Sequence, residues 1–321
     1  KENKLFEINN REKKISQSPL NYTGGKFKLL EQLQPLFDEK ETFLDLFAGG
    51  GNVGINSFSS KVIFNDLNEK LIDLIKFIKD TDTDVLLKQI DSIIDEYDLS
   101  NTSLYGYSYY DCDSSSGLAE CNKERFLRLR DDFNAKVLAG ETDYSMLYVL
   151  MVYSFNNQIR FNRKGLFNLP VGKRDFNSKM RSKLVLFSEE LKSKDIQFMK
   201  KDFREISLDG FSHETFVYCD PPYLITNATY NENGMWTEIE EKALLEFLDE
   251  ANEKGFNFAL SNVLESKNKR NDILYNWIES KGYYCNRLNK SYSNSSYHRK
   301  NKNSISEEVL ITNYPVDWRN E

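Results

Sequence analysis

Histidine, cysteine and proline are scarce in this sequence of 321 residues, which contains 2 His, 4 Cys and 6 Pro. The two histidines, His213 and His298, lie far apart and leave little room for a histidine-rich metal site or a Ser–His–Asp triad, so no metal is expected. No CxxC pair occurs, so neither a zinc knuckle nor a disulfide framework is indicated. Reduced intracellular thiols are therefore expected for Cys112, Cys121, Cys219 and Cys285. No hydrophobic run approaches membrane-spanning length, and the first residues are too polar for a secretory signal.

Acidic residues exceed basic ones, and the net charge of −7 argues weakly against a nucleic-acid partner. The distribution of charge points the other way. Residues 160–183 carry eight basic side chains against one acid, Asp175, and residues 287–302 carry five basic side chains and no acid. Such stretches are often ordinary solvated surface. An acidic body with two basic patches nevertheless suits a protein that grips a polyanion on one face.

Strand-like apolar runs alternate with amphipathic segments along much of the chain. Strands are predicted at 42–47, 61–66, 196–202, 216–220, 256–262, 283–288 and 307–314, and helices at 51–58, 67–80, 237–255 and 271–282. This alternation predicts an α/β fold with a largely parallel sheet covered by helices on both faces. Helical segments at 84–97, 124–140 and 144–155 interrupt the pattern. We therefore expect a catalytic domain formed by 1–80 and 186–321, and a helical insertion at 81–185.

A glycine-rich turn follows the first predicted strand. Gly49, Gly51 and Gly54 fit the G-x-G-x-x-G spacing, and Asp66 ends the next strand, where an acid can accept hydrogen bonds from ribose hydroxyls. A nicotinamide dehydrogenase fits this motif, as does any enzyme with a nucleoside-containing cofactor. Asp45, inside the strand, favours a methyl donor, because a carboxylate there suits the ammonium of a methionine tail and repels a pyrophosphate. Upstream, Lys26 could pair with the carboxylate of the same tail.

The stretch FVYCDPPYLI ends another strand with an acid, two prolines and an aromatic ring. Proline cannot donate to a sheet ladder, so the strand must stop near Asp220. Asp220 and the carbonyl of Pro221 could accept both N–H bonds of an exocyclic amine and aim its lone pair at a methyl group. Pro221 and Pro222 would hold these acceptors rigid, and Tyr223 offers a face for a base that has left its helix.

Taken together, these motifs resemble the Dam-type DNA adenine-N6 methyltransferases, the alpha group of the D12 class. The resemblance spans nearly everything from Leu20 to Tyr314 and includes NYTGGKFKLL, LDLFAGGGNVG, FNDLNEKLI, MKKDFREI, YCDPPY, ALSN and EEVLITNY, in the order of that family. It implies a Rossmann-like methyltransferase fold, S-adenosylmethionine as the cofactor, and double-stranded DNA as the partner. It also implies a base-flipping reaction at adenine N6 that needs no metal.

The resemblance assigns roles to individual positions. Asp220, Pro221, Pro222 and Tyr223 resemble the catalytic loop. The cofactor contacts of the family fall on Tyr22, Lys26, Asp45, Phe47, Gly49, Gly51, Asp66, Asp202 and Phe203, with Asp202 accepting the amino group of the cofactor adenine.

The segment FNNQIRFNRKGLFNLPVGK resembles the recognition hairpin of the GATC-specific enzymes, which read roughly YNGLCRYN followed by GEFNVPFG. Arg160 falls where a guanine-reading arginine stands, Pro170 where a proline touches a thymine methyl, and Phe155 and Asn156 where residues probe or replace the displaced base. Gln158 departs from the pattern, because that group has leucine there, and the third base therefore stays open. The predicted DNA-binding set is Phe155, Asn156, Gln158, Arg160, Asn162, Arg163, Pro170 and Lys173, with the basic side chains gripping phosphate.

Other readings stay open at this point: methylation of cytosine N4, of RNA adenine or of a protein glutamine, and a DNA-binding specificity module without catalysis. Aspartate at position 220 favours adenine over the asparagine- or serine-containing versions of the motif. We expect a monomeric cytoplasmic protein, prokaryotic or phage-encoded, with a restriction endonuclease for the same site as a further candidate partner. Residues 291–306 are basic and rich in Ser and Asn, and this composition makes their ordering only on DNA a hypothesis.

Overall fold

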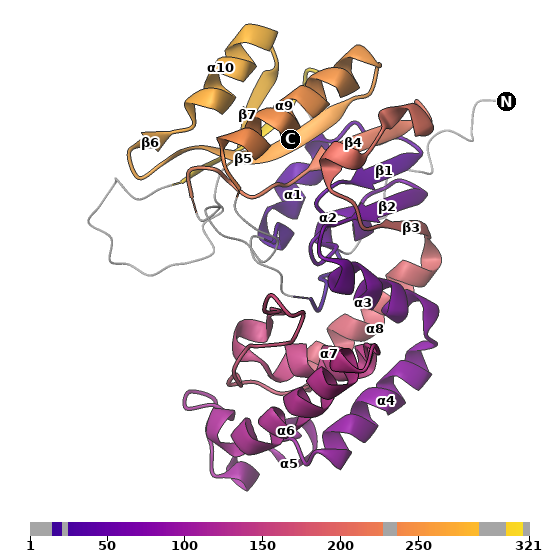
Figure 1. The fold of residues 1–321 in the computed structure, drawn as a ribbon, viewed down its shortest axis with the longest axis vertical. Helices are drawn as coiled ribbons and strands as arrows, with labels where there is room; N and C mark the ends of the chain where they lie inside the picture. The colour runs from indigo at the N-terminus through magenta and orange to yellow at the C-terminus, as the bar shows by residue number, and fades with distance from the viewer. Residues whose placement is uncertain (1–14, 21–24, 227–235, 289–305, 317–321) are drawn as a thin grey trace, which may run out of the picture.

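The protein is described here from a computed structural model, which covers residues 15–20, 25–226, 236–288 and 306–316. Figure 1 shows a twisted sheet with its helices in the upper part and a block of helices, α4 to α8, below it. Tyr22 and residues 291–305, for which sequence predictions were made, lie outside the described ranges.

One sheet organises the upper part of the molecule. Its strands are β1 (Thr42–Asp45), β2 (Lys61–Asn65), β3 (Asp195–Met199), β4 (Thr215–Cys219), β5 (Phe258–Ser266), β6 (Lys269–Arg270), β7 (Tyr284–Arg287) and β8 (Glu307–Thr312). They lie in the order β3-β2-β1-β4-β5-β8-β7, and β6 pairs with β5 as a short side branch. The first five strands of this order pair in parallel, whereas β8 runs antiparallel to both of its neighbours. The predicted mostly parallel α/β sheet is confirmed.

Both faces of the sheet are covered, which explains why its strands read as nearly continuous apolar runs. Successive side chains point to opposite faces. Phe43 and Phe216 accordingly join one buried cluster, whereas their neighbours Leu44 and Val217 join a second cluster. Helices α9 (Glu238–Glu253) and α10 (Asp272–Lys281) contribute to the second cluster.

The other face is covered by α1 (Leu30–Leu33), α2 (Asn52–Ile55) and α3 (Glu69–Asp80). Short 3-10 turns occur at Phe27–Leu29, Gln34–Leu36, Ser108–Tyr110, Phe155–Asn157, Phe203–Glu205 and Leu208–Gly210. Side-chain caps set the starts of the longer helices: the Asn68 side chain accepts the Leu71 N–H at α3, and Thr237 with Glu240 forms a capping box at α9.

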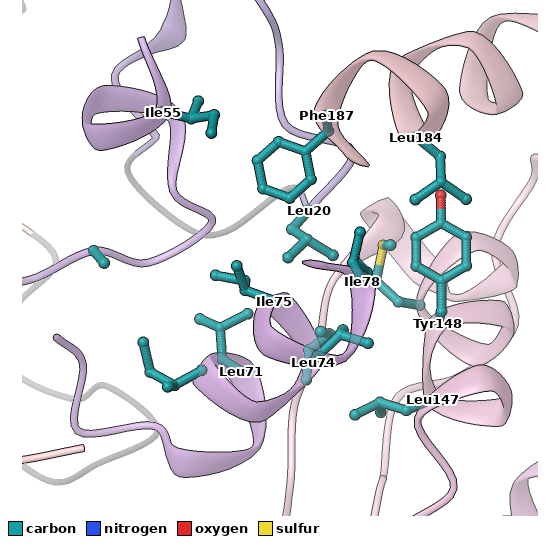
Figure 2. Close-up of a cluster of buried hydrophobic side chains, with 14 of the residues drawn as sticks. Leu20, Ile55, Leu71, Leu74, Ile75, Ile78, Leu147, Tyr148, Leu184 and Phe187 are labelled. Carbon is teal, nitrogen blue, oxygen red and sulfur yellow. The ribbon is translucent and has the colours of Figure 1, made fainter. Parts of the chain in front are cut away.

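The helical block consists of α4 (Thr83–Glu96), α5 (Thr102–Tyr105), α6 (Ala119–Leu138), α7 (Tyr144–Tyr153) and α8 (Ser178–Ser193). Helix α8 was missed in the sequence because its first turns fall within the basic run. Figure 2 shows that the core passes without a break from α2 and α3 into this block, where Leu147 and Tyr148 of α7 and Leu184 and Phe187 of α8 belong to the same buried cluster. Within the described residues, no helix has the length and apolar character needed to cross a membrane.

Tyr148 permits a test of this shared core. Its side chain is fully buried, and its hydroxyl has no hydrogen-bond partner among the described residues. Burying an unpaired hydroxyl costs about 1–3 kcal/mol. We expect Tyr148→Phe to raise the free energy of unfolding by about 1 kcal/mol in urea titrations. A loss of stability of that size would mean that the hydroxyl has a partner, such as a buried water.

Candidate active site at the carboxyl edge of the sheet

The site lies where the strand order reverses direction. Strand β1 pairs with β2 on one side and with β4 on the other, so the connections after β1 and β4 lead to opposite sides of this point. Open α/β sheets bind ligands in the crevice outside the carboxyl ends of such strands. Asp45 is the last residue of β1, and Asp220 directly follows β4, in which Tyr218 lies opposite Asp45. Two predicted functional acids therefore meet at the switch point.

Asp45 is buried with half of its carboxylate unsatisfied. Its Oδ2 accepts the Gly54 N–H at 3.1 Å, whereas Oδ1 is buried without a hydrogen-bond partner among the described residues. The pKa of Asp45 is raised to about 8, because burial and the charges of Asp220 and Asp66 together outweigh the lowering effect of the Gly54 hydrogen bond. A buried, unpaired acceptor beside two other carboxylates is suited to a cationic ligand that can donate hydrogen bonds.

The glycine turn between β1 and α2 keeps side chains away from this edge. Gly49 and Gly51 have φ values of 52° and 83°, a region that favours glycine. A Cβ on Gly54 would lie 3.0 Å from Asp45 Oδ2 and 2.6 Å from the Phe64 ring. Because Gly54 of α2 has no side chain, its backbone N–H lies directly on the Asp45 carboxylate.

Asp66 follows β2 at the same edge. Its Oδ2 accepts the Gly49 N–H at 2.9 Å and its Oδ1 accepts the Asn68 N–H at 2.9 Å, while burial raises its pKa. Each oxygen keeps a further lone pair, so the predicted ribose contact is compatible with this geometry. The next side chain, Leu67, is 44% exposed and adds an apolar surface at this edge that was not predicted from the sequence.

Asp202 and Phe203 follow β3. The Arg204 guanidinium donates to both Asp202 oxygens, at 2.9 and 2.6 Å, and this bonding lowers the Asp202 pKa. Asp202 therefore already has a cationic partner, which the sequence analysis missed. Phe203 is buried, and its ring centroid lies 5.8 Å from that of Phe47 and 6.0 Å from that of Trp236.

Trp236 completes this aromatic cluster and was not predicted. Its ring centroid lies 5.9 Å from that of Phe47, and its Nε1–H donates to Glu241 Oε2 at 2.7 Å. Glu241 is buried and also accepts from Asn262 and Asn271, at 3.3 and 3.0 Å. The helical spacing of α9 explains why Glu241 is buried. The contact of Trp236 with Phe47 and Phe203 is evident only from the tertiary structure.

The acid–proline–aromatic corner is partly exposed and bonded to itself. The Tyr223 hydroxyl donates to Asp220 Oδ1 at 2.8 Å, and Lys26 Nζ lies 3.3 Å from the same oxygen. Lys26 Nζ also lies 4.7 Å from the Tyr223 ring centroid. Burial raises the pKa of Asp220, whereas Lys26 and the Tyr223 hydroxyl lower it. Lys26, predicted as a cofactor contact, thus lies against Asp220 and Tyr223, which were predicted to belong to the catalytic loop.

The predicted recognition segment forms a hairpin below this edge. Isolated bridges pair Ser154 with Val171 and Phe161 with Phe167. The Asn162 side chain accepts the N–H groups of Lys164 and Leu166 and so shapes the turn. All eight predicted DNA-contacting residues belong to this hairpin or follow it directly, and all are exposed except the half-buried Gln158; they are Phe155, Asn156, Gln158, Arg160, Asn162, Arg163, Pro170 and Lys173.

Phe155 and Asn156 stand out at the base of the hairpin. Phe155 is 51% exposed, and Asn156 adopts a left-handed conformation with φ of 56°. The opposite end of the hairpin is tied to the sheet side of the molecule, because Lys70 of α3 donates to the Gly165 carbonyl at 2.6 Å. Lys70 Nζ also lies 4.7 Å from the Phe161 ring centroid.

In the described part of the chain, no three His, Cys, Asp or Glu side chains gather as a metal site would require.

The sheet order, the glycine turn and the acids at one edge define a Rossmann-like methyltransferase fold. The chain belongs to the D12 class N6 adenine-specific DNA methyltransferase family, because residues 22–292 match the sequence profile of that family.

Several characterised proteins are similar to this chain. It is 39% identical over 322 aligned residues to type II methyltransferase M.FokI of Planomicrobium okeanokoites, covering 98% of this chain and 45% of that protein. It is 39% identical over 309 residues to modification methylase StsI of Streptococcus sanguinis, covering 94% of this chain and 43% of that protein. A DNA adenine methylase of Salmonella typhi is 28% identical over 219 residues, 68% of this chain and 69% of that protein. The chain thus spans less than half the length of the two more similar relatives.

Proposed function

We propose that this chain transfers a methyl group from S-adenosylmethionine to N6 of an adenine flipped out of duplex DNA at a specific site. The observation that carries the proposal is the meeting of Asp45 and the Asp220 corner at the β1/β4 switch point. Asp45 offers an unpaired acceptor to a cationic amino-acid tail, and the Asp220 corner offers acceptors to an amine. The bound cofactor supplies an electrophilic methyl group.

The protein groups in this proposal hold and orient the base. The Asp220 carboxylate and the Pro221 carbonyl each accept a hydrogen bond from an N–H group of the adenine amine. These two bonds localise the lone pair of the amine on its nitrogen. Asp220 Oδ1 is bonded to Tyr223 and Lys26 here, which leaves Oδ2 as the acceptor for the amine. The Tyr223 ring offers a face on which the base can stack. These groups need little reorganisation because two prolines fix the corner.

The cofactor residues fit the proposed ligand in different ways. Asp66 has lone pairs for a ribose, and the half-buried Phe47, which packs against the buried Phe203, has a ring that an adenine can contact. Asp202 can accept an amino group if it shares its carboxylate with Arg204. Tyr22 completes the proposed set from outside the described residues.

We assign catalysis to residues 1–80 and 186–321 and DNA recognition to residues 81–185. Helix α8 crosses the boundary between these two parts. Asp175, the only acid of the basic run 160–183, is buried and accepts hydrogen bonds from Ser100 and Thr102. The exposed charge of residues 160–183 is therefore entirely basic, which supports contact with DNA phosphate.

Relatives named as modification methylases support a role beside a restriction endonuclease in the cytoplasm of a prokaryote, and we propose that the chain acts as a monomer.

The test is to incubate the protein with tritiated S-adenosylmethionine and unmethylated duplex DNA, then hydrolyse the DNA and identify the labelled base. Label in N6-methyladenine supports the proposal. Label in N4-methylcytosine would show that the target base is cytosine and not adenine. Tight DNA binding without label would favour a specificity module that lacks catalysis. Sequencing of the methylated DNA then gives the recognition site.

Arg160 gives a second test, directed at base recognition. The side chain is exposed on the hairpin and can bond guanine O6 and N7. We expect Arg160→Ala to relax the base preference at one guanine by about 1–3 kcal/mol, measured as kcat/KM on duplexes that vary one position at a time. A uniform loss on every sequence would instead make Arg160 a phosphate contact.

A further inference from the structure

Arg160 is held by a neighbour across the hairpin, Asn168. The Asn168 N–H donates to the Arg160 carbonyl at 3.2 Å. In return, Arg160 Nε donates to the Asn168 side-chain oxygen Oδ1 at 2.8 Å, and Arg160 Nη2 donates to the Asn168 carbonyl at 3.3 Å. These three bonds fix both the backbone and the guanidinium plane of Arg160 relative to Asn168.

Asn168 is itself firmly placed, because helix α6 binds the backbone on both of its sides. Asn134 of α6 accepts the Phe167 N–H at 2.8 Å and donates to the Phe167 carbonyl at 3.0 Å. Arg130, one turn earlier on α6, donates to the Leu169 carbonyl at 3.1 Å. Phe167 and Leu169 are buried, whereas Asn168 between them is half-buried and faces Arg160. Asn168 is therefore a rigid point on an otherwise exposed hairpin.

The bonds to Asn168 restrict how Arg160 can meet a base. A guanidinium has five N–H donors in one plane, and Asn168 takes the Nε donor and one Nη2 donor. The remaining donors lie at the Nη1 and Nη2 end, and a pair of them can reach guanine O6 and N7. We infer that Asn168 determines specificity as a positioning residue, presenting Arg160 end-on to a single guanine. This inference rests on the proposed reading of guanine by Arg160.

A direct contact of Asn168 with phosphate is the competing role, and its chemistry differs. Phosphate oxygens only accept hydrogen bonds, so such a contact must use the Asn168 side-chain N–H₂ group. Positioning of Arg160 uses the side-chain oxygen instead. Replacement by aspartate keeps that oxygen, removes the N–H₂ group and adds a negative charge, so it separates the two roles.

The experiment uses the full chain and unmethylated duplexes that carry the recognition site. Each of the four bases is placed in turn at the guanine position that Arg160→Ala identifies. We expect Asn168→Ala to lower discrimination for guanine by about fivefold to tenfold in kcat/KM, while affinity for unrelated duplex DNA stays unchanged. We expect Asn168→Asp to retain most of the discrimination. Arg163→Ala, an exposed basic neighbour, serves as a matched control that should weaken all sequences alike.

Three results would overturn the inference: unchanged discrimination in Asn168→Ala, an equal loss on all four bases, or discrimination lost equally in Asn168→Ala and Asn168→Asp. Thermal melting of each variant separates these outcomes from a failure of folding, and retained activity of Asn168→Asp confirms an intact hairpin. If Arg160→Ala relaxes no position, the proposed reading of guanine fails together with the inference. If it relaxes one position that Asn168→Ala leaves intact, only the inference fails.

Discussion

Asp220→Ala is expected to lower the rate of methyl transfer by about a thousandfold or more, because it removes an acceptor that acts on the amine as it reacts. Its effect on cofactor binding is expected to be small. Asp220 follows β4, and its oxygen Oδ1 is bonded to Tyr223 and Lys26 rather than to the glycine turn. Single-turnover rates on pre-bound DNA and equilibrium dialysis with S-adenosylmethionine measure the two properties separately.

Asp66→Ala is the matched comparison for this prediction. Asp66 accepts the Gly49 N–H in the glycine turn, so its loss should weaken cofactor binding far more than the Asp220 change does. A loss of cofactor affinity in Asp220→Ala equal to that in Asp66→Ala would contradict the assignment of Asp220 to the base. Tyr223→Phe adds a further comparison, since it removes the hydroxyl bond to Asp220 but keeps the ring for stacking.

The positions of these acids could be predicted because local rules govern them. Apolar runs that end at a carboxylate or a proline mark where parallel strands end, and all such ends meet at one edge of the sheet. Asp66 and Asp220 were placed correctly at that edge for this reason, whereas Asp45, predicted inside a strand over 42–47, is the last residue of the shorter strand β1. The proline pair also fixed the end of β4 to within one residue.

The partners of these acids could not be predicted, because they depend on how distant segments pack. Lys26 lies at Asp220, and nothing in the sequence near either residue indicates that pair. Arg204 lies only two residues from Asp202, yet the two side chains meet because Asp202 caps the 3-10 turn Phe203–Glu205, which the sequence does not indicate. Helix α8 was hidden by its basic surface, although Leu184 and Phe187 face the core. Burial of Asp175 was hidden for the same reason.

Asp45 gives the second prediction with a large expected effect, a dependence of cofactor affinity on pH. Burial raises the pKa of this carboxyl to about 8 in the ligand-free protein. A bound ammonium stabilises the ionised form, so binding lowers the pKa and releases a proton. Affinity for S-adenosylmethionine should therefore rise with pH by up to about tenfold per unit between pH 6 and 7.5. Calorimetry in buffers of different ionisation enthalpy measures the released proton directly.

Asp45→Asn should remove this pH dependence and weaken cofactor binding by about 2–5 kcal/mol, because a buried charge pair loses one partner. The same change should stabilise the ligand-free protein. A carboxyl with its folded pKa raised above the unfolded value near 3.8 costs stability as pH rises from about 4 to 8, and the amide does not ionise. The melting temperature of Asp45→Asn should therefore exceed that of the wild type by more at pH 8 than at pH 5. Unchanged cofactor affinity, or a gain in melting temperature that is equal at both pH values, would show that Asp45 is not the ionising group that receives the cation.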